Sequence, residues 1–134
     1  MPPARLDDLG GRFVRLTTYR RDGTPVPTPM WFVADGDGVW LWTRLESGKV
    51  RRLRNNADVT VAPCDSKGEV TGSARSGTAK LAGPTEPSAE RLFDEKYGLP
   101  LKLWRRAHAL IRRLGRGHEW VYVRVELTEA FGAS

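Results

Sequence analysis

The sequence predicts an α+β, mainly β domain: an antiparallel six-stranded barrel flanked by short helices. Six short runs with alternating or β-branched side chains are separated by turn signals. The first three runs follow one another through short connections, as hairpins do. The helical segments do not alternate with the strands, which argues against parallel winding. The 134 residues suffice for one domain with a modest core, which we place at 1–134.

The first three strands should form a meander. The predicted strands are 12–19 (RFVRLTTY), 26–33 (VPTPMWFV) and 39–43 (VWLWT), joined by turn signals at Asp22-Gly23 and at 34–38. Side chains of the third strand should alternate between two faces, with Val39, Leu41 and Thr43 on one and Trp40 and Trp42 on the other.

The second strand has prolines at alternate positions, Pro25, Pro27 and Pro29. Their missing N–H groups all fall on one edge, so this edge cannot pair fully. Two interpretations stay open. The prolines protect an edge against aggregation, or the edge faces a groove in which a planar ring lies against the backbone.

A basic helix follows the third strand, where VWLWT runs through RLESG into KVRRLRNN. Val50 and Leu53 can face the core, and the cations lie on the two flanks: Lys49 and Arg52 on one, Arg51 and Arg54 on the other. The first turn of a helix has unpaired N–H groups, so a phosphate or carboxylate is favoured there, and Ser47 could add a hydroxyl. From this segment alone, a merely solvated face is an equally good interpretation.

The second half of the chain adds three strands and two helices. We expect strands at 58–64, 70–82 and 119–127, and helices at 86–97 and 101–114. The second helix should pack through an apolar stripe of Leu103, Ala107, Leu110 and Leu114. In the last strand one face should be core, and the other, with Trp120, Tyr122, Arg124 and Glu126, should meet solvent, a ligand or a subunit.

The composition leaves several acidic partners open. A net charge of +6 is compatible with nucleic acid, an anionic lipid surface or a polyanionic small molecule. The basic helix lacks interleaved aromatic residues, so we do not expect nucleic acid. No apolar run is long enough to span a membrane, and we expect no membrane partner. The single cysteine, Cys64, and the lack of a secretory signal predict a cytoplasmic protein.

No motif for intrinsic catalysis is present. His108 and His118 are ten residues apart without other ligands at a usual spacing, so no metal site is expected. The sequence also lacks a nucleophile elbow, a phosphate loop and a dinucleotide fingerprint. If the protein is an enzyme, a cofactor carries the chemistry, and we name no catalytic residue.

One long run resembles a known family. The segment RRDGTPVPTPMWFVADGDGVWLWTRLESGKVRRLRNNADVTVAPCDSKGEVTG is similar to the split-barrel flavin and deazaflavin oxidoreductases typified by pyridoxamine 5′-phosphate oxidase. More narrowly, it resembles their probable coenzyme F420-dependent branch. The most specific pieces are the Asp-Gly turn followed by T-P-M-W-F, the strand ending at Thr43, S-G-K at 47–49, and R-L-R-N-N before V-T-V-A-P-C-D.

The resemblance implies an FMN-binding split-barrel fold and a homodimer with cofactor sites at the subunit interface. It implies that the cofactor ring lies along Thr28, Pro29, Met30 and Trp31, and that the phosphate end is bound by Thr43, Arg44, Ser47, Gly48, Lys49 and Arg54. The implied activity is hydride transfer between reduced coenzyme F420 and a small conjugated substrate. The alternatives are an FMN-binding protein of the same class and a non-catalytic carrier of a cofactor or tetrapyrrole.

The outward face of the last strand has a further implied role. Trp120, Tyr122 and Arg124 are candidates for dimer or pocket contacts, and plain surface exposure is an equal alternative.

Overall fold

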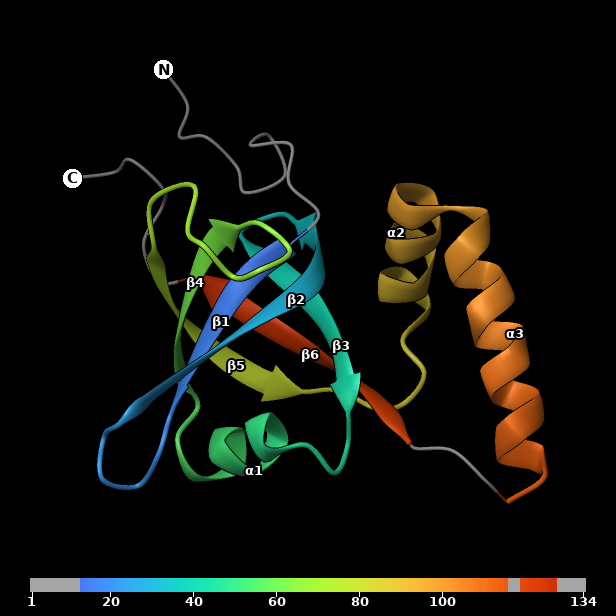
Figure 1. Cartoon of the computed structure of the whole chain (residues 1–134), viewed down its shortest axis with the longest axis horizontal. Helices are drawn as coiled ribbons and strands as arrows, with labels where there is room; N and C mark the ends of the chain where they lie inside the picture. The colour runs from blue at the N-terminus through green and yellow to red at the C-terminus, as the bar shows by residue number, and fades with distance from the viewer. Residues whose placement is uncertain (1–12, 116–118, 128–134) are drawn as a thin grey trace.

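Six antiparallel strands close into a barrel in the order β1-β2-β3-β6-β5-β4 (Figure 1). The computed structural model describes residues 13–115 and 119–127, so Arg12 and His118 lie outside the described residues. The strands are β1 (Phe13–Tyr19), β2 (Pro25–Asp35), β3 (Gly38–Arg44), β4 (Asp58–Cys64), β5 (Arg75–Leu81) and β6 (Trp120–Leu127). The helices are α1 (Gly48–Asn55), α2 (Pro87–Tyr97) and α3 (Leu99–Arg113). The predicted six-stranded antiparallel barrel is confirmed.

One predicted strand is shorter than expected. The strand predicted at 70–82 begins only at Arg75, and before it Val70 forms one isolated bridge with Cys64. The intervening residues are small and polar, TGSA, and offer little side-chain surface to hold a strand against its neighbours.

The second strand changes partner along its length. Residues 25–31 of β2 pair with β1, and residues 32–35 pair with β3. The edge of residues 25–31 on the β3 side therefore has no neighbouring strand among the described residues, and we call it the free edge of β2. At the change of partner, the Tyr97 hydroxyl accepts from the Phe32 N–H at 2.9 Å and donates to the Phe32 carbonyl at 2.6 Å. The predicted incomplete pairing is confirmed.

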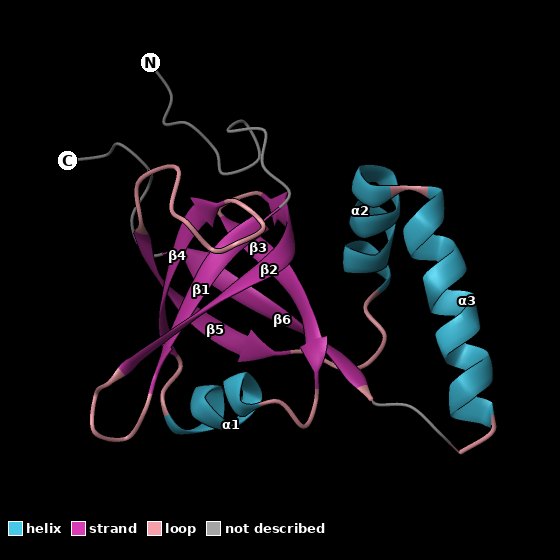
Figure 2. Ribbon diagram, in the orientation of Figure 1, coloured by secondary structure: helices cyan, strands magenta, loops and turns pink. Residues whose placement is uncertain are grey.

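Two apolar clusters stabilise the fold. The larger fills the barrel and includes Val14, Leu16, Phe32, Leu41, Val61, Val123 and Val125, together with Leu53 of α1. The smaller lies outside the barrel under α2 and α3 and contains Val33, Ala89, Phe93, Leu101 and Tyr122. Figure 2 shows α2 and α3 together on one side of the barrel and α1 at one of its ends.

The last strand corrects one expectation. Tyr122 was expected on an exposed face, but only 1% of its surface is accessible. It points out of the barrel, where α2 covers it, and its ring centroid lies 6.0 Å from that of Phe93. Arg124, also on this face, is held by Asp35 at 3.1 Å and by Glu126 at 2.7 Å.

The prediction of which face of α3 packs against the protein is wrong. The residue of α3 that is buried is Leu101, whereas Leu103, Leu110 and Leu114 of the predicted packing stripe are exposed. The face toward the barrel carries Trp104, which packs edge-on against Trp42 at 5.3 Å. No helix in the described part of the chain has the length and apolar character needed to cross a membrane.

Candidate functional site

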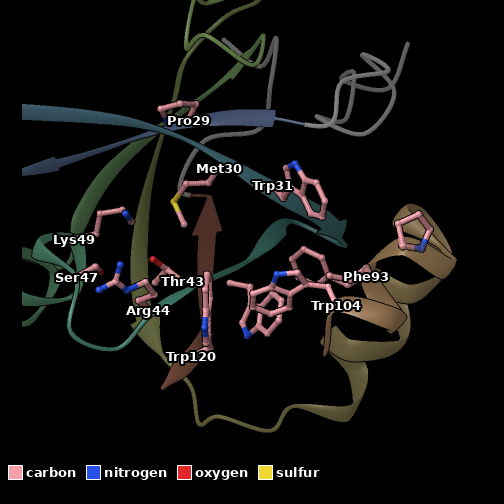
Figure 3. Close-up of a pocket in the computed structure, with 13 residues that line it drawn as sticks. Pro29, Met30, Trp31, Thr43, Arg44, Ser47, Lys49, Phe93, Trp104 and Trp120 are labelled. Carbon is pink, nitrogen blue, oxygen red and sulfur yellow. The ribbon is translucent and has the colours of Figure 1, made fainter. Parts of the chain in front are cut away.

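A cleft of about 740 Å³ lies between the free edge of β2, the end of β3, the start of α1 and the α2–α3 pair (Figure 3). This volume is typical of sites for small molecules and cofactors. The lining residues are Pro29, Met30, Trp31, Trp42, Thr43, Arg44, Ser47, Lys49, Phe93, Pro100, Leu101, Trp104 and Trp120. In Figure 3, Arg44, Ser47 and Lys49 gather at one end, and Trp31, Phe93 and Trp104 lie at the other.

The polar end is built by a strand, a turn and a helix. β3 ends at Arg44, and the Ser47 N–H donates to the Arg44 carbonyl at 3.1 Å, which closes the turn. Ser47 then caps α1, since its hydroxyl oxygen accepts from the Val50 N–H at 3.4 Å. Val50 is completely buried and fixes the helix against the barrel. The Ser47 hydroxyl hydrogen stays available to donate to a ligand.

The electrostatics of this end favour an anion. Partial burial lowers the pKa of Lys49, and the neighbouring cations Arg52 and Arg44 lower it further. In residues 13–115 and 119–127, neither Lys49 nor Arg44 has a carboxylate partner. A bound phosphate or carboxylate would relieve this repulsion, because an opposite charge stabilises the protonated lysine.

Gly48 lies against a neighbouring arginine at the start of α1. It does not line the cleft, and a Cβ built on it would lie 2.9 Å from Nη1 of Arg52. Arg52 is itself fixed by a hydrogen bond of 2.6 Å from Nε to the hydroxyl of the buried Thr18. Gly48 thus leaves room for Arg52 to lie along the first turn of α1.

Seven of the ten predicted site residues line the cleft. They are Pro29, Met30, Trp31, Thr43, Arg44, Ser47 and Lys49. Thr28, Gly48 and Arg54 do not line it. Thr28 precedes the lining segment of β2, and Arg54 is exposed on the last turn of α1.

The sequence analysis predicted only part of the aromatic end, namely Trp31 and, as a candidate contact, Trp120. Trp31 stacks on Tyr97 at a centroid distance of 4.5 Å. Three tryptophans form a continuous wall, with centroid distances of 4.9 Å for Trp42–Trp120, 5.3 Å for Trp42–Trp104 and 5.3 Å for Trp104–Trp120. The missed residues are Trp42, Phe93, Pro100, Leu101 and Trp104. Trp120, which was a candidate contact, lines the cleft.

A sequence signal existed for Trp42 but not for the helical residues. The alternation of VWLWT placed Trp42 opposite the core-facing residues, where an aromatic ring needs a covering element. Phe93, Leu101 and Trp104 belong to the cleft because α2 and α3 fold back beside β2 and β3, which periodicity alone does not reveal.

The described lining of the cleft contains few ionisable side chains. It contains no Asp, Glu, His, Cys or Tyr, and Arg44 and Lys49 are its ionisable residues. A search of the described residues also finds no cluster of possible metal ligands. The chemical groups that the described lining offers to a ligand are cations, hydroxyls and aromatic rings.

The comparison with protein families shows to which family the chain belongs. The family model described as "Pyridoxamine 5′-phosphate oxidase" matches residues 9–114, most of the chain. The chain belongs to this family. Members of the family bind flavin-type cofactors, and its superfamily contains oxidoreductases. None of the curated proteins compared with the chain matches it.

Solved structures support the same fold. An F420 reductase is 19% identical, with a TM-score of 0.59, and the match covers 96% of this chain and 97% of that one. A putative pyridoxamine 5′-phosphate oxidase from Listeria innocua is 18% identical, with a TM-score of 0.60 and coverage of 92% and 88%. The heme storage protein HutZ from Vibrio cholerae is 14% identical, with a TM-score of 0.58 and coverage of 89% and 83%. At such identities the likeness shows the fold alone.

The residues of the cleft fit a flavin-type cofactor. Such a cofactor has a planar, largely apolar ring and an anionic phosphate, and the cleft has an aromatic end and a cationic end. The Lys49 ammonium has no carboxylate partner among the described residues, so it can form an ion pair with the phosphate of such a cofactor.

Proposed function

We propose that the protein is a coenzyme F420-dependent oxidoreductase that transfers hydride between the reduced deazaflavin and a small conjugated substrate. The polarity of the cleft is the observation that supports this most strongly. Its cationic end, with Arg44 and Lys49, and its aromatic end, with Trp31 and Trp104, belong to one continuous space. That arrangement suits a ligand with a ring at one end and a phosphate at the other.

Each end would bind its part of the cofactor through named groups. Thr43, Ser47, Arg44 and Lys49 would bind the phosphate through hydroxyl donors and cations. The ring would lie along Pro29, Met30 and Trp31, beside the free edge of β2.

The protein's own contribution would be binding, orientation and exclusion of water. The coenzyme supplies the hydride when bound. The tryptophan wall limits the positions of a planar substrate beside the ring, which raises the effective concentration of the reacting groups. Because no side chain with an ordinary acid function lines the described cleft, the proton that completes the reduction would come from solvent.

The choice of F420 over FMN rests on cations beyond the phosphate end. Arg51 and Arg54 are exposed on α1, the helix that also carries Lys49 and that follows Arg44 in the chain. The acidic oligoglutamate tail of F420 would reach such cations, whereas FMN ends at its phosphate. Each exposed contact contributes modestly.

The cofactor choice is tested by titrating F420 and FMN into the same preparation and following fluorescence. We expect tighter binding of F420, and we expect Arg51→Glu to weaken F420 without weakening FMN. The exposed Arg91→Glu on α2 is the matched control. Tighter binding of FMN would overturn the cofactor choice and leave the fold unaffected.

Turnover separates an enzyme from a carrier. Reduced F420 is mixed with the protein and with quinones, nitroaromatics and biliverdin, and the absorbance of the reduced coenzyme is followed. Binding without turnover on the whole panel would favour the carrier. A haem carrier has less support, because Met30 is the one residue of the described cleft lining with a side chain that commonly ligates haem iron.

We also propose a cytoplasmic homodimer whose partner subunit completes the cleft. Trp31 and Trp104 line the cleft and are still 39% and 41% exposed in the single chain. Exposed tryptophans at the rim of a site are typical of surfaces that a partner covers. Light scattering should give the mass of two chains, and a monomer that binds F420 fully would exclude this arrangement.

A further inference from the structure

The outer face of α3 is apolar and has no partner in the part of the chain that the structure describes. Leu99, Leu103, Leu110 and Leu114 are 65%, 57%, 59% and 70% exposed. At 100° per residue these positions fall within one sector of the helix, opposite Leu101. Figure 1 shows α3 at the edge of the molecule, with α2 and the barrel on its other side. The helix is amphipathic, but its apolar stripe points away from the protein.

The charged side chains of α3 are all basic. The helix, LPLKLWRRAHALIRR, contains no Asp or Glu. Two of its cations are engaged on the inner side, where Arg105 binds Asp94 at 2.7 Å and Arg112 binds Glu119 at 3.1 Å. Three others, Lys102, Arg106 and Arg113, are exposed. By helical geometry these three lie along one flank of the leucine stripe.

A second copy of the chain fits this face poorly. Two α3 helices packed antiparallel through their stripes would set the cationic flank of one against the same flank of the other. The repulsion between these facing cations would oppose association of the two copies. The exposed apolar surface of α3 is mostly leucine, with Ala107 and Ile111 beside the stripe, and the tryptophan of this helix, Trp104, packs on Trp42 and Trp120 at the cleft. The stripe itself therefore lacks the aromatic anchors that dominate protein interfaces.

An anionic lipid surface meets both requirements. Leucine side chains can enter the boundary between headgroups and acyl chains, while the flanking cations bind the acidic headgroups. We propose that α3 docks this protein onto an anionic membrane surface, with Leu103 and Leu110 as the central inserted residues. The helix lies in the plane of the membrane, so the mode needs no spanning segment. The expectation that no membrane partner exists rested on the lack of such a segment.

The test is flotation of the purified full chain with vesicles. One set contains phosphatidylcholine alone, and the other contains equal parts of phosphatidylcholine and phosphatidylglycerol. We expect flotation with the anionic vesicles only, and release at high salt. Leu103→Glu and Leu110→Glu should each lower the vesicle-bound fraction about tenfold, because each replaces an inserted apolar group by a charge that anionic lipid repels.

Two matched variants control for general effects. Val70→Glu changes an exposed apolar residue of the loop between β4 and β5, and Arg91→Glu removes an exposed cation from α2. Both should float like the unaltered protein. All substituted positions are exposed, and circular dichroism checks that the variants are folded.

Several results would overturn the proposal. Failure of the unaltered protein to float with anionic vesicles would do so, as would undiminished flotation of Leu103→Glu. If Val70→Glu and Arg91→Glu lost as much of the vesicle-bound fraction as the leucine variants, the protein would bind by general electrostatic attraction and not through α3. If Leu110→Glu halves the mass measured by light scattering, a second copy covers the stripe instead of lipid.

Discussion

α1 and α3 share a pattern of apolar and basic residues, but α1 buries its apolar face and α3 exposes it. Both helices combine leucine or valine at helical spacing with several Lys and Arg residues, and neither has an acidic residue in its first turn. α1 turns Val50 and Leu53 inward, whereas α3 turns Leu103 and Leu110 outward. An amphipathic pattern therefore defines two faces of a helix without telling which one the fold buries.

The surroundings explain the difference. α1 lies at an end of the barrel, where Leu53 joins the barrel's apolar cluster. α3 meets the aromatic outer wall of β3 and β6, where Trp104 packs on Trp42 and Trp120, and its Arg105 binds Asp94 of α2. The partly polar, aromatic face of α3 packs against that wall, and the leucines therefore lie on the outer side of the helix.

The largest expected effect compares the same substitution in both helices. Leu53→Ala should lower the free energy of unfolding by about 2–5 kcal/mol, because it leaves a cavity in the core. Leu110→Ala should change it by less than about 0.5 kcal/mol, because Leu110 is already exposed. Urea denaturation measures both. Similar losses in the two variants would mean that α3 buries its stripe in solution.

The local part of this fold was predictable. Alternation in β3 and β6 follows from neighbouring residues, and the turn and helix start between Thr43 and Lys49 have local signals, such as the Ser47 cap. The polar end of the cleft could therefore be located from the sequence, and its residues lie together.

The rest depends on contacts between distant segments. The burial of Tyr122 requires α2 above it, and the aromatic end requires Trp42, Trp104 and Trp120 to meet from three elements. The orientation of α3 depends on partners such as Asp94 and Glu119, which no periodicity within α3 indicates.

The second effect compares a lysine from each helix. Lys49→Ala should weaken binding of F420 by about 10- to 100-fold, since a hydrogen bond to a charged group contributes about 1.5–3 kcal/mol. Lys102→Ala, on the outer side of α3, should leave the affinity unchanged. Fluorescence titration gives both constants. Unchanged binding by Lys49→Ala would remove this lysine from the phosphate site.

A third, smaller effect tests what sets the orientation of α3. Gly98 joins α2 to α3 with φ of 73° and ψ of −150°, a conformation that residues with a Cβ rarely adopt. Gly98→Ala should cost about 1–2 kcal/mol of unfolding free energy. Gly83→Ala is the control, because a Cβ there meets only ordinary contacts at 3.9 Å and needs no positive φ. Equal stability of the two variants would mean that the connection does not constrain α3.

The smallest effect is a dependence on pH. The pKa of Lys49 lies below its ordinary value of 10.5, because of burial and the nearby Arg52 and Arg44. Only the protonated lysine attracts an anion, so F420 affinity should fall as the pH rises through this lowered pKa, before an exposed lysine would deprotonate.

For the free protein the sign is opposite. The folded state binds fewer protons than the unfolded state between the lowered pKa and 10.5, so its stability should rise with pH in that window. Lys49→Arg should remove most of both dependences, because a guanidinium stays protonated over this range. Titrations and urea denaturation at a series of alkaline pH values measure them. A Lys49→Arg variant with the same loss of affinity would assign the titration to another group, and the cationic end of the cleft would then owe its charge chiefly to the arginines.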